Sequence, residues 1–320
     1  MYRYFRLRAK LLGVPQLHYY DIYPLLVKGD FKIPYAEGRK LVLEAVAPPG
    51  KDYVAALENG LDHRCMDIYP RPRKQSAAHM NGYAYDVHPY VLMNYNDDYE
   101  AVTSIAHEWG HAMHSYLANK AQPFVTANHA TFVAEIASTF NEDLLLEHVL
   151  QTAKTDDECL YYLGTALEGL RGTFFPQAMF AEFERNIHAR VDRGEPLTGD
   201  ALSKTYCDIL KRCHGAAEGV VAIDDTYCVE SAYYIPHFYN AVYVYQYATS
   251  IAASSLFAKR VLAGELGALD RYLTMLKAGG SNYPYDLVKA AGVDLAADGR
   301  DRGDPRQADE IGCAPGIRRG

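Results

Sequence analysis

The sequence predicts a mainly α-helical protein with one small β-hairpin or sheet. Apolar residues recur at helical spacing over most of the second half of the chain. The helix-compatible stretches cover residues 98–118, 156–192, 198–214, 236–263 and 266–278, together with the stretch from the loop at 121–127 to residue 150. Only residues 82–96 are rich in β-branched and aromatic residues between turn-prone ends, so we expect one or two strands there, beside the helix that follows.

The segments before that strand region are short. Residues 1–35 mix helical spacing with aromatic clusters, and we expect His18 and Asp21 to make local hydrogen bonds rather than take part in catalysis. Residues 34–59 predict two short helices separated at Pro48-Pro49-Gly50. Residues 67–80 have the composition of a loop.

The later boundaries are also marked by residue type. Asn96, Asp97 and Asp98 offer side-chain caps for the helix over 98–118. Gly279-Gly280-Ser281 interrupts the last helical stretch before a final short helix. We expect residues 1–292 to form a catalytic domain and residues 293–320, which are rich in Asp, Arg, Gly and Pro, to form a disordered tail.

Composition excludes several classes of partner. The chain has 320 residues, is 49% hydrophobic and carries a formal net charge of −8, which argues against a general nucleic-acid partner. No apolar run approaches the roughly 20 residues that span a bilayer. The N-terminus is interrupted by charge and lacks the apolar centre of a secretory signal. The six scattered cysteines contain no C-x-x-C pair, so we expect reduced thiols in a cytoplasmic protein.

The pattern with the most chemical content is His107-Glu108-Trp109-Gly110-His111, an H-E-x-x-H motif. On a helix the two histidines lie one turn apart on the same face, where both imidazoles can bind one zinc ion. Glu108 then points toward a water molecule at that ion. The motif therefore predicts a hydrolytic zinc site with one ion per chain.

A catalytic zinc ion of this kind takes a third protein ligand and keeps one open position. The nearby candidates are His114, His129, Glu135, Glu142 and His148. Glu135 is preferred because it lies on an otherwise apolar helical stretch, where an unpaired carboxylate is costly. Glu142, two turns later, either orients a ligand histidine or is a surface residue, and His114 is expected to be a surface or second-layer histidine.

The ligand set gives Glu108 a defined role as the general base that takes a proton from the attacking water and returns it to the leaving amine. The developing oxyanion also needs a donor. His237 precedes Tyr239, Tyr243 and Tyr247, which are spaced four apart on one predicted helical stripe. This stripe predicts either packing at the edge of the core or a catalytic donor. The strand region before the motif predicts a sheet edge that binds an extended peptide.

These residues together resemble the oligoendopeptidase F branch of the thimet oligopeptidase family of zinc metallopeptidases. The matching segments, within residues 15–293, are HPYVLMNYN, TSIAHEWGHAMHSYLANKAQPF, FVAEIASTFNEDLL and IPHFYNAVYVYQYATS. The resemblance implies a helical zincin-type bundle whose channel admits short peptides. It implies zinc ligation by His107, His111 and Glu135, and general-base catalysis by Glu108. It also implies that His237 with Tyr243 or Tyr247 stabilises the transition state.

Members of that family usually carry a long helical region before the matched part, so we expect the N-terminal lobe to be largely absent from this chain. The leading hypothesis is a zinc endopeptidase that hydrolyses internal bonds of short peptides. The alternatives are a non-catalytic remnant that binds zinc and peptides, and a zinc carboxypeptidase that removes single residues. The sequence does not indicate an oligomeric state.

Overall fold

The computed structural model describes residues 1–27, 29, 31–234 and 242–297. Contacts group the chain into two compact units, each with its own core. The first unit comprises residues 1–28 and 164–248, and the second comprises residues 29–163 and the chain from residue 249 onward. The predicted domain boundary at residue 292 stays a prediction.

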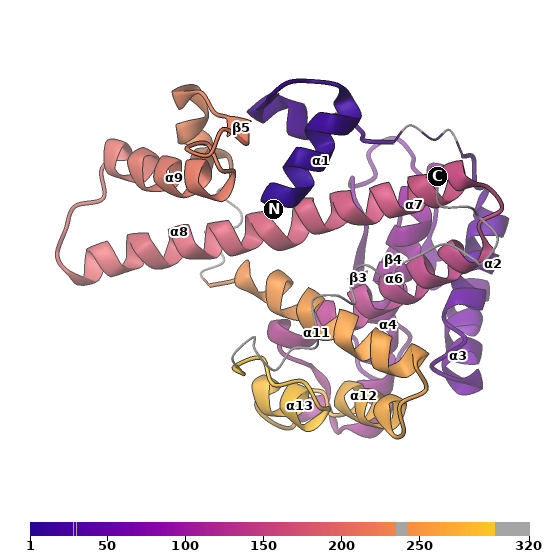
Figure 1. The fold of residues 1–320 in the computed structure, drawn as a ribbon. Coiled ribbons are helices and arrows are strands. Elements are labelled where there is room, and N and C mark those ends of the chain that lie inside the picture. The colour runs from indigo at the N-terminus through magenta and orange to yellow at the C-terminus, as the bar shows by residue number, and fades with distance from the viewer. Residues whose placement is uncertain (28, 30, 235–241, 298–320) are drawn as a thin grey trace. The chain divides into compact units, whose positions relative to one another are not determined.

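The second unit is mainly helical, as predicted (Figure 1). Its helices are α2 (Tyr35–Ala45), α3 (Lys51–Asp62), α4 (Tyr99–Ala121), α5 (Phe124–Ala127), α6 (Thr131–Thr152), α12 (Ala268–Lys277) and α13 (Pro284–Ala290). Two further helices contribute to both units: α7 (Asp156–Gly169) and α11 (Tyr245–Leu262). No helix in the described residues is long and apolar enough to cross a membrane.

Helix α4 is the centre of the second unit. The Asp98 carboxylate accepts a hydrogen bond from the amide of Ala101 at 2.7 Å, which confirms the predicted N-terminal cap. Val102, Ile105 and Trp109 are buried in a cluster that includes side chains of α2 and α3. One face of α4 is thereby fixed in the core, and the histidines of the motif lie on another.

Helices α4 and α6 pack against each other at very short range (Figure 1). Gly110 makes this possible: a Cβ atom there would lie 2.4 Å from the carbonyl oxygen of Ala137 and 2.6 Å from Cα of Ser138. Both of those atoms belong to the backbone of α6. A residue with any side chain would therefore push the two helices apart.

A buried hydrogen-bonded bridge also holds α6 in register with α4. The Asn141 amide donates to the carbonyl oxygen of Ala106 at 3.2 Å and accepts from the hydroxyl of Tyr53 at 3.0 Å. Asn141 is fully buried, so each of these bonds replaces a water contact that the side chain has lost. The bridge connects α3, α4 and α6 at the level of the motif.

The small sheet of the second unit has the order β2-β4-β3. Its strands are β2 (Met66–Asp67), β3 (His79–Asn81) and β4 (Tyr90–Leu92). Strand β2 runs parallel to β4, and β3 pairs with β4 in the antiparallel sense and forms an edge. The prediction of one or two strands within residues 82–96 is confirmed by one strand, β4, which contacts α4. Its partner strands lie at the two ends of residues 67–80, which we expected to be a loop throughout. The chain turns between β3 and β4 at Asp86, where φ is 62°.

The first unit contains α1 (Tyr2–Leu12), the 3₁₀ helices η1 (Tyr19–Ile22) and η3 (Asp225–Tyr234), the π-helical turn η2 (Leu170–Phe174), α8 (Phe175–Asp192) and α9 (Gly199–Cys213). Strands β1 (Leu17–His18) and β5 (Val221–Ala222) pair in parallel. The carboxylate of Asp21 accepts from the amide of His18 at 2.8 Å, so Asp21 has the local structural role that we expected. The core of the first unit includes Phe5, Phe183 and Tyr206.

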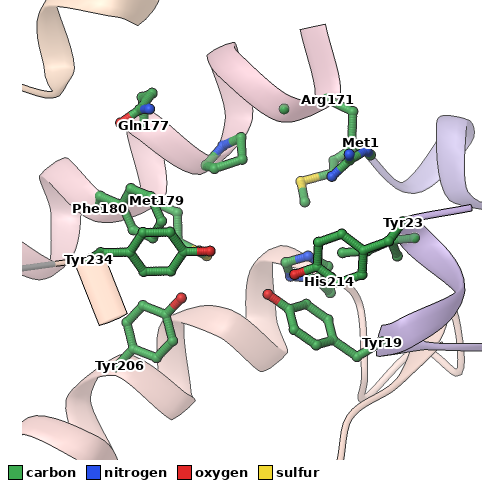
Figure 2. A pocket seen from close by; sticks show the side chains of 13 residues that line it. Met1, Tyr19, Tyr23, Arg171, Gln177, Met179, Phe180, Tyr206, His214 and Tyr234 are labelled. Atoms are coloured by element: carbon green, nitrogen blue, oxygen red, sulfur yellow. The ribbon is translucent and has the colours of Figure 1, made fainter. Parts of the chain in front are cut away.

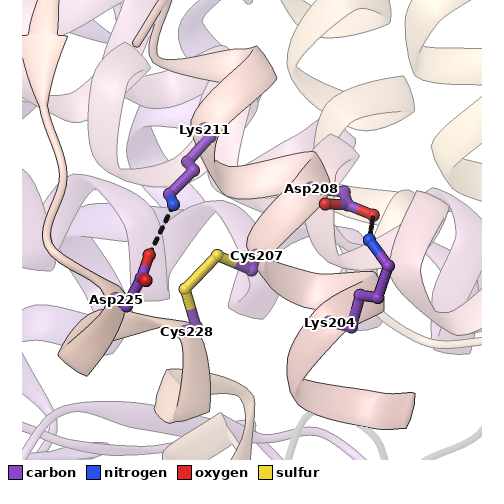
Figure 3. Close-up of a disulfide and its surroundings, with 6 residues drawn as sticks. All are labelled: Lys204, Cys207, Asp208, Lys211, Asp225 and Cys228. Carbon is purple, nitrogen blue, oxygen red and sulfur yellow. Dashed lines mark hydrogen bonds and ion pairs between the residues drawn. A yellow bond between two sulfur atoms is a disulfide. The ribbon is translucent and has the colours of Figure 1, made fainter. Parts of the chain in front are cut away.

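A disulfide between Cys207 and Cys228 connects α9 to η3 (Figure 3). The prediction of reduced thiols throughout is therefore wrong for this pair, whereas Cys65 and Cys213 are free thiols. The two cysteines lie 21 positions apart in the sequence and meet because η3 packs on α9. Spacing alone could not indicate that contact.

Two further expectations concern the C-terminal part. The predicted helix over 236–263 is wrong at its described N-terminal end, because α11 begins at Tyr245 and Val242 has a positive φ of 59°. The predicted tail over 293–320 falls largely in 298–320, which lies outside the described residues. Val293, at its start, is buried in a core cluster of the second unit.

One buried carboxyl group gives the second unit a testable pH dependence. Burial, aided by the nearby Glu142 carboxylate, raises the pKa of Asp143 from 3.8 to about 7. As pH rises, the unfolded chain releases this proton first, so Asp143 lowers stability progressively between the two pKa values and by a constant amount above them. At about 1.4 kcal/mol per pKa unit, the upper limit is roughly 4 kcal/mol.

We therefore expect Asp143→Asn to raise the free energy of unfolding, with a gain that grows between roughly pH 5 and pH 8. Fluorescence of Trp109, the single tryptophan, follows unfolding of this unit in urea. The exposed Asp192 provides the control Asp192→Asn. A gain of equal size at both pH values would contradict the assignment.

Candidate metal centre

Helices α4 and α6 bring His107, His111 and Glu135 together. The Nε2 atoms of the two histidines lie 3.2 Å apart. The Oε2 atom of Glu135 lies 3.3 Å from Nε2 of His107 and 3.4 Å from Nε2 of His111. Three candidate ligand atoms from two helices therefore form a nearly equilateral triangle.

The size and chemistry of this triangle fit a zinc ion. Zinc bonds to imidazole nitrogen and carboxylate oxygen are about 2.0–2.2 Å long, so neighbouring ligands of a tetrahedral ion lie about 3.3 Å apart. Two imidazoles and one carboxylate are a ligand set found in catalytic zinc sites, which keep a fourth position open. The side chains are 27%, 14% and 12% exposed for His107, His111 and Glu135, so the site is sheltered and still reachable from solvent.

Two further residues of α6 orient these side chains. Nδ1 of His107 donates to the Glu142 carboxylate, which directs Nε2 toward the triangle. The hydroxyl of Ser138 donates to Oε2 of Glu135 at 3.0 Å. The sequence left two roles open for Glu142, and the structure pairs it with a candidate ligand. Ser138 was missed, although its place one turn after Glu135 on a helix is a usable signal.

The charges at the triangle support one another. Burial alone would raise the pKa of Glu135, but hydrogen bonds to His107 and His111 hold that pKa well below its usual value. Burial likewise opposes the charged form of His107, but the carboxylates of Glu135 and Glu142 raise its pKa well above its ordinary value. Glu135 is therefore ionised at neutral pH, as a carboxylate ligand must be.

Glu108 lies beside this triangle on α4 and is 7% exposed. Burial raises the pKa of its carboxyl group, while the charges of His107 and His111 act in the opposite direction. A raised pKa suits a group that takes up and releases a proton during a reaction. The charge of His79, on edge strand β3, also acts on Glu108. Sequence reasoning missed His79 because we expected its segment to be a loop.

The other candidate ligands lie elsewhere in the second unit. His114 is buried and stacks on His129 with ring centroids 3.7 Å apart. Burial lowers the pKa of His114 well below its usual value and that of His129 to about 4, so both are neutral at pH 7. Nε2 of His148 lies 3.6 Å from the Glu44 carboxylate. The structure thus groups His107, His111 and Glu135 and leaves these three histidines apart.

The predicted donors for the oxyanion belong to the first unit or fall outside the described residues. Tyr243 and Tyr247 are hydrogen-bonded through their hydroxyl groups, with ring centroids 5.4 Å apart. Tyr243 precedes α11, so the pair does not form a stripe on one helix. His237 and Tyr239 lie outside the described residues. The roles of His237, Tyr243 and Tyr247 stay predictions.

Comparison with known proteins gives consistent matches. The chain is similar to Oligopeptidase PepF of Bacillus subtilis (strain 168), with 42% identity over 298 residues, 93% of this chain and 44% of that protein. It is similar to an oligoendopeptidase F homolog of Borreliella burgdorferi, with 38% identity over 295 residues, 91% of this chain and 49% of that protein. The chain thus spans about half the length of these relatives or less.

Two solved structures agree with this. A putative peptidase from Chlamydophila abortus matches with a TM-score of 0.82 and 38% identity, over 92% of this chain and 49% of that one. Oligoendopeptidase-F from Enterococcus faecium matches with a TM-score of 0.66 and 34% identity, over 92% of this chain and 44% of that one. The model of peptidase family M3 matches residues 3–300. The chain belongs to peptidase family M3.

Proposed function

We propose that this chain acts as a zinc-dependent endopeptidase that hydrolyses internal bonds of short peptides. The observation that carries the proposal is the triangle of His107, His111 and Glu135, with edges of 3.2–3.4 Å and Glu108 beside it. Relatives named oligopeptidase and oligoendopeptidase support this class of reaction. A cytoplasmic location stays a prediction.

The proposed ligands would hold one zinc ion, which supplies Lewis-acid activation of water and of the scissile carbonyl group. Glu108 accepts a proton from the attacking water and passes it to the leaving nitrogen. Its buried position keeps the carboxylate poorly solvated and therefore more basic. Glu142 fixes the His107 ring so that Nε2 is the ligand atom.

Edge strand β3 is the proposed binding site for the peptide backbone. One side of β3 pairs with β4, and the strand contacts α4. An extended peptide can add to such an edge through main-chain hydrogen bonds, which requires no particular side chains. His79 on this strand connects the edge to Glu108 electrostatically. His237 with Tyr243 or Tyr247 is the proposed donor for the oxyanion.

Metal removal and restoration test the proposal. With an internally quenched fluorescent peptide, we expect a chelator to abolish cleavage and stoichiometric zinc to restore it, since the ligand triangle has the size for one ion. Metal analysis should find one zinc per chain. Mass spectrometry of the products should show internal cleavage, whereas a ladder of single-residue losses would indicate a carboxypeptidase. Full zinc binding without cleavage of any peptide would favour a non-catalytic binding protein.

A further inference from the structure

The first unit contains a cavity of about 290 Å³ that the proposed reaction does not use (Figure 2). Residues of η1, η2, α8, α9 and η3 line it. Ligand pockets usually measure about 300–1,000 Å³, so this one has the size for a single amino acid or a dipeptide. Its apolar wall includes Ile22, Met179 and Phe180.

Four tyrosines line one side of the cavity, and their hydroxyl groups surround the partly buried carboxylate of Glu230. Glu230 Oε2 accepts from the hydroxyls of Tyr19 at 2.7 Å and Tyr206 at 3.0 Å. The hydroxyls of Tyr23 and Tyr234 reach Oε1 at 3.4 and 3.5 Å. Figure 2 shows these hydroxyl groups turned toward the middle of the cavity. Because the hydroxyl hydrogens point to Glu230, the oxygen lone pairs and ring faces are what remains for a ligand, and both attract a cation.

Two more acceptors reinforce this preference. Nδ1 of His214 donates to the carbonyl oxygen of Leu210 at 2.9 Å, which leaves Nε2 as an acceptor. Burial lowers the pKa of His214 to about 4, so the ring is neutral at pH 7. Oε1 of Gln177 is buried and has no hydrogen-bond partner among the residues that the structure describes. A buried acceptor without a partner is costly, and an ammonium group of a ligand would satisfy it.

A positive charge lines the cavity as well. Nε of Arg171 donates to Oε2 of Glu168 at 2.9 Å, and Oε1 of the same carboxylate accepts from Arg8 at 2.6 Å. Among the described residues, the Arg171 guanidinium group makes no hydrogen bond or ion pair besides the one from Nε to Glu168, so its two Nη atoms can donate to a ligand carboxylate. In Figure 2, Arg171 lies across the cavity from Tyr206.

Opposite charges on two sides of a small cavity select a ligand that carries both charges. We propose that this cavity binds a zwitterionic amino acid or dipeptide. The ammonium group of the ligand points toward Glu230 and the tyrosines around it, and the carboxylate of the ligand points toward Arg171. Met179 and Phe180 then contact an apolar side chain. A ligand with only a positive charge would be repelled by Arg171, and a ligand with only a negative charge would be repelled by Glu230. The site does not depend on the proposed hydrolysis.

The test measures direct binding of ligands to the full chain. Binding is detected by NMR of the methionine residues, which are labelled with ¹³C in their methyl groups. Met179 lines the cavity, whereas Met93 and Met113 are buried in the other unit and serve as internal references. The measurement uses Glu108→Gln, whose expected slow turnover keeps the peptides intact, and mass spectrometry of the sample checks that they remain so. The probes are L-leucine, L-alanyl-L-leucine, its N-acetyl form and its C-terminal amide. We expect the Met179 signal to shift with one or both zwitterions and each blocked peptide to bind at least tenfold more weakly than the free dipeptide.

Variants assign each end of the ligand. Glu230→Gln should remove the preference for a free ammonium group, and Arg171→Gln should remove the preference for a free carboxylate, while Arg171→Lys keeps the latter. The exposed Glu218 provides the charge-matched control Glu218→Gln. Equal binding of free and blocked peptides to the unaltered cavity would overturn the proposal even if a variant failed to fold. So would the absence of any Met179 shift with either zwitterion.

Discussion

Glu108→Gln is expected to lower kcat for peptide cleavage by about 10²–10⁴-fold. The amide has almost the same shape as the carboxylate but cannot accept a proton from water. Glu108 is buried beside the triangle, and the geometry assigns ligation to His107, His111 and Glu135, so zinc binding should persist. The effect should therefore appear in kcat rather than in metal content.

The measurement pairs steady-state kinetics on a quenched peptide with metal analysis of the same preparation. Glu100 lies on α4 and is exposed, so Glu100→Gln makes the same chemical change away from the site and should retain activity. Full activity in Glu108→Gln with zinc bound would exclude Glu108 as the general base. Loss of zinc together with activity would show instead that Glu108 supports the ligands.

The grouping of His107, His111 and Glu135 was predictable because the signals for it are local in the sequence. His107 and His111 are one turn apart, and helix geometry places them on the same face without any knowledge of the fold. Glu135 could be chosen because a carboxylate in an apolar stretch needs a partner. The cap at Asp98 follows from the same local chemistry. Each of these inferences needs only the residues within a few turns.

The features that the sequence did not predict depend on contacts between segments that are distant in the chain. Strand β4 has partners from residues 66–67 and 79–81, and nothing in their own composition marks those short segments as strands. His79 therefore could not be placed near Glu108. The disulfide between Cys207 and Cys228 depends in the same way on how η3 packs against α9.

Gly110 depends both on a local sequence signal and on a contact with a distant segment. Its place in the motif is visible in the sequence, but its purpose appears only when α6 lies against it, with backbone atoms 2.4–2.8 Å from a hypothetical Cβ. We expect Gly110→Ala to weaken zinc binding at least tenfold and to lower the free energy of unfolding by about 1–3 kcal/mol. Alanine favours a helix over glycine by about 1 kcal/mol, but backbone atoms cannot rotate out of the way as a flexible side chain can.

The expected loss of zinc affinity in Gly110→Ala has a geometric reason. Two triangle edges connect α4 to α6 and measure 3.3 and 3.4 Å, so any separation of the helices lengthens both of them. Competition with a chromophoric chelator measures the affinity, and Trp109 fluorescence in urea measures stability. Gly169→Ala is the matched control, because Gly169 is helical and a Cβ there meets nothing within 4 Å. That control should be as stable as the original chain or slightly more so, with unchanged zinc binding. If Gly110→Ala also retained full zinc affinity, the spacing of α4 and α6 would not be what sets the ligand triangle, and the orienting contacts of Ser138 and Glu142 would have to set it instead.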